Sequence, residues 1–175
     1  MKIRILALSI FCLSTLSACW AESDSSVKQL KTLRLAEQIS KMEESGELPK
    51  LERTDTLDGI DNDQNGIRDD IDAYMQKNFT DADQQNAVKQ FAKSMQEFLL
   101  ANPDDREAAK AASIKNSKAI SCIYLRFPAD NAYEIVNDID AITTNTKKRL
   151  LASIAVDEAL DGTVISEQNG DVCDE

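Results

Sequence analysis

The sequence predicts an all-α fold, a single domain of five or six helices that carries one aspartate-rich loop. Three observations predict it. Apolar residues recur at helical spacing along most of the chain. The chain holds only five glycines and three prolines, and no run alternates apolar with polar residues. The most strand-like stretch, 163–165, is too short to predict a strand.

The first 18 residues, MKIRILALSIFCLSTLSA, have the pattern of a secretory signal peptide. Lys2 and Arg4 give a positive start, and an apolar run follows as far as Leu16. The run is too short to cross a bilayer as a permanent helix. We therefore expect residues 1–18 to be removed on export, which leaves 157 of the 175 residues, enough for one domain with its own core.

The end of this run, Leu16-Ser17-Ala18-Cys19, resembles the lipobox of bacterial lipoproteins. The resemblance implies a diacylglycerol on the Cys19 sulfur, a further acyl chain such as palmitate on its amine, and stable membrane anchoring. Trp20 stands where an aspartate would signal inner-membrane retention, which favours the outer membrane, facing the periplasm. Residues 19–26 then form the lipidated cysteine and a polar tether. The alternative is an ordinary signal peptide in which Cys19 is incidental.

Acidic residues dominate the chain, with 31 Asp and Glu against 20 Lys and Arg and a net charge of −11. Because the leader carries two basic residues and no acidic ones, the remainder has a net charge of −13. Such a surface disfavours nucleic acid and anionic lipid head groups as partners. The absence of histidine excludes His-based triads, His-ligated zinc and imidazole acid–base catalysis.

Two of the four cysteines, Cys122 and Cys173, remain after export and lipidation. In an oxidising compartment we expect them to form an intramolecular disulfide. It would close a loop of about 50 residues and hold the polar C-terminal tail on a helix. The alternative is two separate thiols.

The helical domain is expected over residues 27–175. Apolar residues recur at helical spacing over residues 24–45, which predicts the first helix there. A short helix is expected from Asp69. Another follows Thr80-Asp81-Ala82-Asp83, which resembles a capping box with Asp in place of Glu. An apolar stripe then runs to Leu99.

The second half of the domain is also expected to be helical. Asn102-Pro103 predicts a helix start, and Pro128 predicts its end. Residues 143–146, TTNT, are either a break or a weak point within one long helix. The apolar residues around them are expected to face the core: Tyr133, Val136, Ile139, Ile142, Leu150, Leu151, Ile154 and Leu160.

Residues 61–72, DNDQNGIRDDID, place five aspartates and two asparagines around one glycine. Ca²⁺ takes six to eight oxygen ligands, which a twelve-residue EF-hand loop supplies from positions one, three, five, seven, nine and twelve, with glycine at six. Gly66 falls at position six. The ligand positions hold Asp61, Asp63, Asn65, the backbone carbonyl of Ile67, Asp69 and Asp72. The spacing therefore predicts a Ca²⁺ site, with a solvated cluster of Asx turns as the alternative.

The loop resembles the calcium loops of dockerins and of thrombospondin type 3 repeats, and the DxDxNGxRDD stretch of small exported bacterial proteins. It departs from the EF-hand of intracellular sensors in three ways. Position twelve is Asp72 rather than Glu, and position eight is Arg68 rather than an apolar residue. Pro49 and Gly59 interrupt the preceding segment, so we expect a loop followed by one exiting helix. Extracellular loops of this kind bind at about 10⁻⁴–10⁻³ M, which favours a structural ion.

No catalytic constellation emerges from the sequence, and we expect a non-catalytic binding or scaffolding module of the cell envelope whose protein partner is unknown. The alternative is an envelope enzyme, or an enzyme accessory, that uses carboxylates the sequence does not single out. Lys118 and Ser121 are three residues apart on a predicted helix, a spacing that a Ser–Lys nucleophile could use but that is common by chance.

Overall fold

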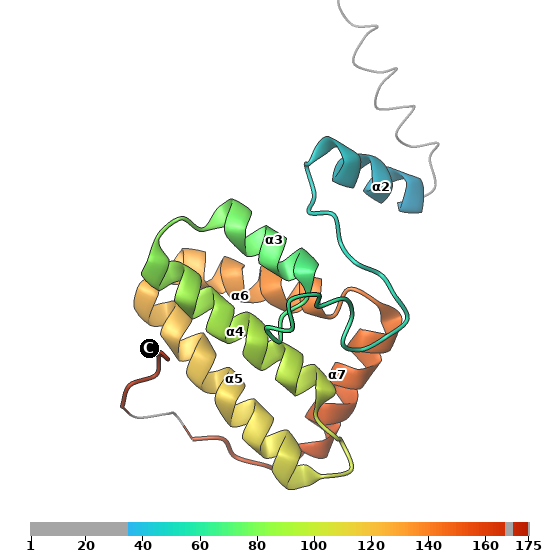
Figure 1. The fold of residues 1–175 in the computed structure, drawn as a ribbon. Coiled ribbons are helices and arrows are strands. Elements are labelled where there is room, and N and C mark those ends of the chain that lie inside the picture. Colours follow the sequence, from blue (N-terminus) through green and yellow to red (C-terminus); the bar gives the residue numbers. More distant parts are fainter. Residues whose placement is uncertain (1–34, 167–169, 175) are drawn as a thin grey trace, which may run out of the picture. The chain divides into compact units, whose positions relative to one another are not determined.

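The computed structural model describes residues 35–166 and 170–174, which form six α-helices and no strand (Figure 1). This confirms the predicted all-α fold. The helices are α2 (Leu35–Ser45), α3 (Asp69–Asn78), α4 (Ala82–Leu100), α5 (Arg106–Arg126), α6 (Ala129–Thr143) and α7 (Lys147–Ala159). The chain divides into two units between residues 48 and 49, so that α2 belongs to the first unit and α3 to α7 belong to the second.

In the first unit, α2 occupies the second half of the helix expected over 24–45. It buries none of its side chains. Residues 24–34 lie outside the described part of the chain, as do the expected leader, Cys19 and the tether. Among the described residues, no helix is long and apolar enough to cross a membrane.

The second unit is built around α4, which packs against α3, α5, α6 and α7. The closest pair is α4 and α5, which run antiparallel and are joined by a short turn (Figure 1). Their shared surface carries most of the core, since Val88, Phe91 and Ile123 are almost fully buried there. Burying such side chains contributes about 1.5–3 kcal/mol each. The α4–α5 pair therefore forms the centre of the second unit.

Two predicted helix starts are wrong by a few residues. The cap of α4 is Asp81, whose carboxylate accepts a hydrogen bond from the Gln84 amide, so the capping box assigned to Thr80 is displaced by one residue. Residues 102 and 103 form a turn instead of the start of α5, because the Asn102 side chain accepts from the Asp104 amide. Asp105 caps α5 in their place. In both cases an aspartate nearer the helix competes better for the free amides.

The two possibilities for residues 143–146 resolve as a break between α6 and α7. Thr146 caps α7 by accepting from the Arg149 amide. The inward face of α7 differs from the prediction, because Leu150, Leu151 and Ile154 are 48%, 53% and 42% exposed. Tyr133, the first residue of the predicted stripe, is 64% exposed. The fully buried residues of α7 are Arg149 and Val156. The face of α7 that packs against the rest of the unit is therefore the one that carries Arg149, and not the apolar stripe.

The C-terminal tail is fastened to α4 and α5. Cys173 is joined to Cys122 of α5 by a disulfide with the two Cα atoms 5.0 Å apart, as predicted. Val172 is buried against the core, and its carbonyl accepts from Gln90 Nε2. Residues 163–165 form no strand, and Val164 is largely exposed.

Candidate metal centre

The aspartate-rich loop turns sharply at Gly66, as predicted, and also at Gln64. Gly66 has φ +86° and Gln64 has φ +58°, both in the left-handed region. The Asp61 carboxylate accepts from the backbone amides of Gly66 (2.9 Å) and Asn65 (3.2 Å), and these bonds draw the chain around Asp61. The loop therefore curls around its own first aspartate.

The loop leads directly into α3, and residues 49–60 form no entering helix, as predicted. Ile67 is fully buried and joins the main core. The Asp69 amide donates to the Ile60 carbonyl (2.9 Å) and ties the two ends of the loop together. Three aspartates, Asp69, Asp70 and Asp72, lie in the first turn of α3, where carboxylates are favoured by the free amides and the helix dipole.

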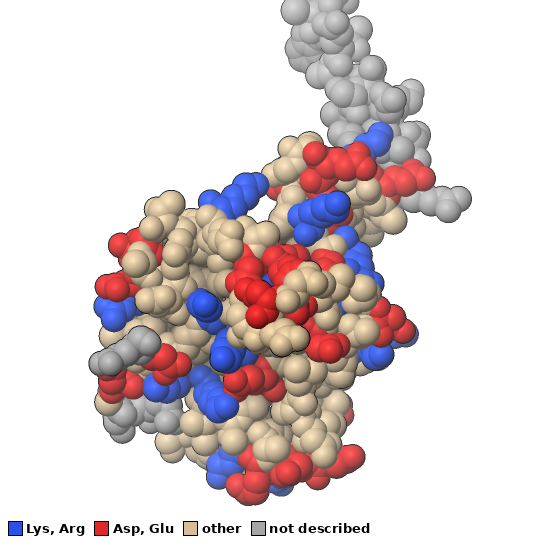
Figure 2. Space-filling model, in the orientation of Figure 1, with Lys and Arg blue, Asp and Glu red and all other residues tan. Residues whose placement is uncertain are grey.

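Three of the predicted ligands converge. One carboxylate oxygen from each of Asp61, Asp63 and Asp69 lies within 4.8 Å of the other two. Figure 2 shows acidic side chains gathered where the loop passes over α4, with basic side chains beside them. Such a group has the dimensions of a cation site, because oxygens on opposite sides of a Ca²⁺ ion are separated by about 5 Å.

Two other predicted ligands are linked to this group by hydrogen bonds. Asn65 Nδ2 donates to Asp63 (3.0 Å) and to Asp72 (2.8 Å), so the amide of Asn65 lies between two carboxylates. Asn65 Oδ1 accepts from the Ile67 amide at 2.8 Å in an Asx turn, and because an amide oxygen has two lone pairs this bond does not prevent it from ligating an ion. The role of the Ile67 carbonyl stays a prediction.

The carboxylates of the loop differ in their electrostatic surroundings. Burial works to raise the pKa of Asp61, but hydrogen bonds from Gly66 and neighbouring groups outweigh it and lower that pKa. Burial raises the pKa of Asp72, and the negative charges of Asp63 and Asp61 raise it further, although the hydrogen bond from Asn65 and the charge of Lys89 oppose them. A cation near Asp72 would therefore offset part of the repulsion that its carboxylate meets from Asp63 and Asp61.

A cavity of about 330 Å³ lies between the loop and α4. Asp61 and Gly66 line it from the loop, and Lys93, Gln96 and Glu97 line it from α4. It leaves Asp61, the first predicted ligand, open to a small ion from solvent.

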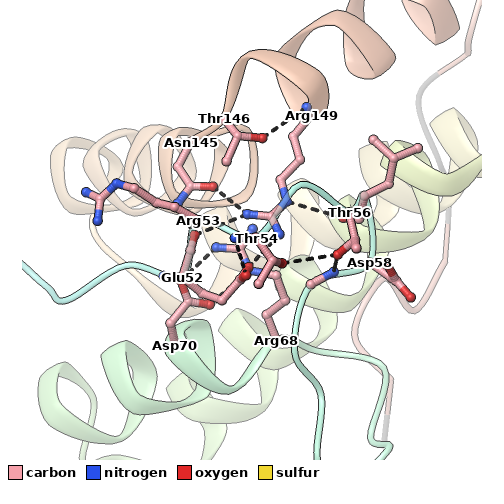
Figure 3. Close-up of polar contacts among 12 residues, drawn as sticks. Glu52, Arg53, Thr54, Thr56, Asp58, Arg68, Asp70, Asn145, Thr146 and Arg149 are labelled. Atoms are coloured by element: carbon pink, nitrogen blue, oxygen red, sulfur yellow. Dashed lines mark hydrogen bonds and ion pairs between the residues drawn. The ribbon is translucent and has the colours of Figure 1, made fainter.

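A buried network of charged residues, which no sequence pattern predicts, lies beside the loop (Figure 3). Arg68 is fully buried and makes a bidentate pair with Asp70, at 2.9 Å and 2.7 Å. Arg149 is also fully buried and pairs with Glu52. The backbone amide of Glu52 donates to Asp70 (2.9 Å), which joins the two pairs. Asn145 adds bonds to Arg149 and to the Glu52 carbonyl, so the network connects three separate parts of the chain.

The network lowers the pKa of Glu52. Burial alone would raise that pKa, but hydrogen bonds from Thr54 and Arg149, together with the positive charge of Arg149, outweigh it. The partners are far apart in sequence, with Glu52 and Arg149 separated by 97 positions. No periodicity marks such a contact, and isolated Arg and Glu residues are usually solvated.

The residues considered for a Ser–Lys nucleophile have other partners. Lys118 Nζ pairs with Asp174 at 3.2 Å, and Ser121 Oγ donates to the Ser117 carbonyl at 3.0 Å. Each group is therefore engaged in a structural contact of the second unit.

Comparison of the chain with family models, with curated proteins and with solved structures finds no match.

Proposed function

We propose that this protein is a lipid-anchored module of the bacterial cell envelope whose helical unit is stabilised by one Ca²⁺ ion at residues 61–72. The observation that carries the metal function is the convergence of Asp61, Asp63 and Asp69 within 4.8 Å. The left-handed turn at Gly66, position six of the pattern, supports it as well.

The donor set suits Ca²⁺ better than other common ions. All predicted ligands are oxygens, which excludes a preference for soft or imidazole-binding metals. Mg²⁺ keeps several waters and uses few protein ligands, whereas this loop offers carboxylates at four positions. When bound, the ion would supply two positive charges among the carboxylates of Asp61, Asp63, Asp69 and Asp72 and would offset part of their mutual repulsion. The ion's role is structural, because it fixes the chain at the start of α3.

The envelope location is supported by the sequence alone, through the leader and the lipobox that ends at Cys19. The predicted −13 charge outside the leader suits a periplasmic protein that binds cations or a basic partner. Lys118 pairs with Asp174, and Ser121 donates to the Ser117 carbonyl. We propose a binding or scaffolding role for the helical unit.

Calorimetric titration of Ca²⁺ into the metal-stripped protein tests the metal function. Wild type should take up one ion per chain with a dissociation constant of about 10⁻⁴–10⁻³ M. Asp61→Ala with Asp63→Ala should abolish uptake, because it removes two of the three converging carboxylates. A control with Asp104→Ala and Asp130→Ala makes the same charge change away from the loop and should bind as wild type does. Equal binding by both double variants would overturn the proposal.

Lipid anchoring is tested separately in a bacterial host that processes lipoproteins. Labelled palmitate should be incorporated into the wild-type protein, and the mature protein should fractionate with membranes. Cys19→Ala should lose the label. Label retained by that variant, or absent from wild type, would overturn the lipoprotein assignment.

A further inference from the structure

Arg68 occupies position eight of the proposed calcium loop and is turned into the protein. It is fully buried, and its side chain ends at the C-terminus of α6. There its guanidinium donates to the carbonyls of Ile142 (3.0 Å) and Thr143 (3.2 Å). These carbonyls belong to the last turn of the helix and have no partner within it. A cation at this position is favoured by the helix dipole as well.

Arg68 also touches both ends of the loop. Before the loop, Gly59 lies so close that a Cβ there would overlap the Cδ and Cγ atoms of Arg68. At the end of the loop, the Arg68 carbonyl accepts from the amides of Ile71 and Asp72, both at 3.0 Å, in the first turn of α3. A shift of Arg68 would therefore move Asp69 and Asp72, two of the predicted ligands.

The same guanidinium connects the loop to the segment before it, residues 49–58. Arg68 binds both oxygens of Asp70, and Asp70 accepts from the Glu52 amide. Arg68 Nε also lies 3.8 Å from the Glu52 carboxylate, which pairs with Arg149 of α7. Polar contacts of this kind hold much of the segment in place, since Gln96 and Lys148 bind the carbonyls of Asp58 and Asp55.

We propose that Arg68 is the positioning residue of the calcium loop, and that its buried guanidinium links ion binding to the docking of residues 49–58 on α6 and α7. In paired EF-hands the loop is supported by a second loop, whereas here a helix C-terminus and a buried ion pair take that place. Linkage between two sites is reciprocal, so weakening the Glu52 contact should weaken ion binding although Glu52 is no ligand. This inference rests on the proposed calcium function.

The first test is Arg68→Lys. This variant keeps the positive charge, but a lysine ammonium cannot bind both Asp70 and the α6 carbonyls as the planar guanidinium does. Supporting contacts of this type typically change metal affinity by about 10–100-fold, and we expect at least about tenfold weaker Ca²⁺ binding by calorimetry. Arg126→Lys, at an exposed pair with Asp83, is the matched control and should bind as wild type does. Ile123→Val separates affinity from stability, because it lowers the melting temperature through the core alone.

The second test is Glu52→Gln, which should weaken Ca²⁺ binding severalfold. Its control is Glu97→Gln, which makes the same charge change in the cavity that Asp61 lines but outside the Arg68 network. A third readout needs no ion. Amide hydrogen exchange at Gly66 and Ile67, which donate to Asp61 and Asn65, should be faster in Arg68→Lys than in wild type.

The outcomes are distinct. Weaker binding in Arg68→Lys and Glu52→Gln, with unchanged binding in the three controls, supports the linkage. Wild-type affinity in Arg68→Lys overturns it and leaves the calcium function intact. An equal loss of Ca²⁺ affinity in Glu52→Gln and Glu97→Gln would mean that the loss comes from long-range charge alone, and this would also overturn the linkage. If wild type takes up no ion, the calcium function and the linkage both fail, and the exchange rates then decide only whether Arg68 orders the ion-free loop.

Discussion

At the scale of single residues, the loop depends on a glycine that lies outside the metal-binding pattern. Gly59 has φ +71°, which only glycine adopts without strain, and a side chain there would meet buried Arg68. Gly162 has nearly the same φ, +72°, but has open space around it. An alanine at Gly162 would therefore meet backbone strain alone, whereas an alanine at Gly59 would meet both backbone strain and steric overlap.

Gly59→Ala should destabilise the second unit by more than Gly162→Ala does. Backbone strain alone costs about 1–2 kcal/mol at either position. At Gly59 the overlap with Arg68 adds to it, because the guanidinium is held by Asp70 and cannot move away freely. Denaturant unfolding of both variants measures the difference. Equal losses would mean that the Arg68 side chain shifts without cost.

Glu52 gives the network a pH dependence. Its folded-state pKa lies below the reference value of 4.5, so its contribution to stability is present above about pH 4.5 and is lost as the pH falls through the folded-state pKa. Glu52→Gln should cost about 1–3 kcal/mol at neutral pH, because Arg149 loses its buried counter-charge. The difference between wild type and variant should shrink as the pH is lowered from about 7 to 3. A difference that is constant across this range would contradict the account.

The convergence of the three loop aspartates was predictable, whereas the contacts that support the loop were not. The spacing of the pattern predicts that Asp61, Asp63 and Asp69 lie close together. These residues are near one another in sequence, so a tight turn is enough to bring their carboxylates together. Arg68 was predicted only as a departure from the pattern at position eight. Its partners at Ile142 and Thr143 are 74 and 75 positions away, a separation at which single-sequence patterns carry no information.

At the scale of elements, the helices were predictable because their apolar residues recur with the period of a helix. α7 shows the limit of this argument. Leu150, Leu151 and Ile154 define an apolar stripe, but the helix turns Arg149 inward. The burial of a charged side chain is favourable only where partners such as Glu52 and Asn145 meet it, and these come from distant parts of the chain.

The disulfide between α5 and the C-terminal tail should be the largest local contribution to the stability of the second unit. Cys122 and Cys173 are 51 positions apart, and the chain-entropy model assigns such a loop roughly 4 kcal/mol. Cys122→Ala with Cys173→Ala should lower the free energy of unfolding by about that amount in a denaturant titration. Reduction of the wild-type protein should give a similar loss. A loss below about 1 kcal/mol would show that Val172 and Gln90 hold the tail by themselves.

At the scale of the whole molecule, the charge of the chain and the proposed ion belong together. A net charge of −13 outside the leader opposes compaction, and several of these charges crowd into one loop. A bound Ca²⁺ would relieve part of this repulsion at the place where the loop meets α4.

Calcium should therefore raise the melting temperature. With a dissociation constant of about 10⁻⁴ M, 1 mM Ca²⁺ stabilises the folded state by about 1.4 kcal/mol, which is a few degrees for a unit of this size. A chelator should reverse the shift, and Mg²⁺ at the same concentration should give a smaller one. An equal shift with Mg²⁺, or with monovalent salt at matched ionic strength, would indicate general screening instead of a site.

The most direct measurement of the central claim is the position of the ion itself. Crystals grown with Ca²⁺, or with a lanthanide in its place, should give one strong anomalous peak in the loop, at about 2.3–2.6 Å from oxygens of Asp61, Asp63 and Asp69. Asn65 should then have turned its carbonyl oxygen toward the ion, and Arg68 should remain bound to α6. Absence of a peak from the loop at millimolar calcium, or a peak only at other acidic side chains, would contradict the account.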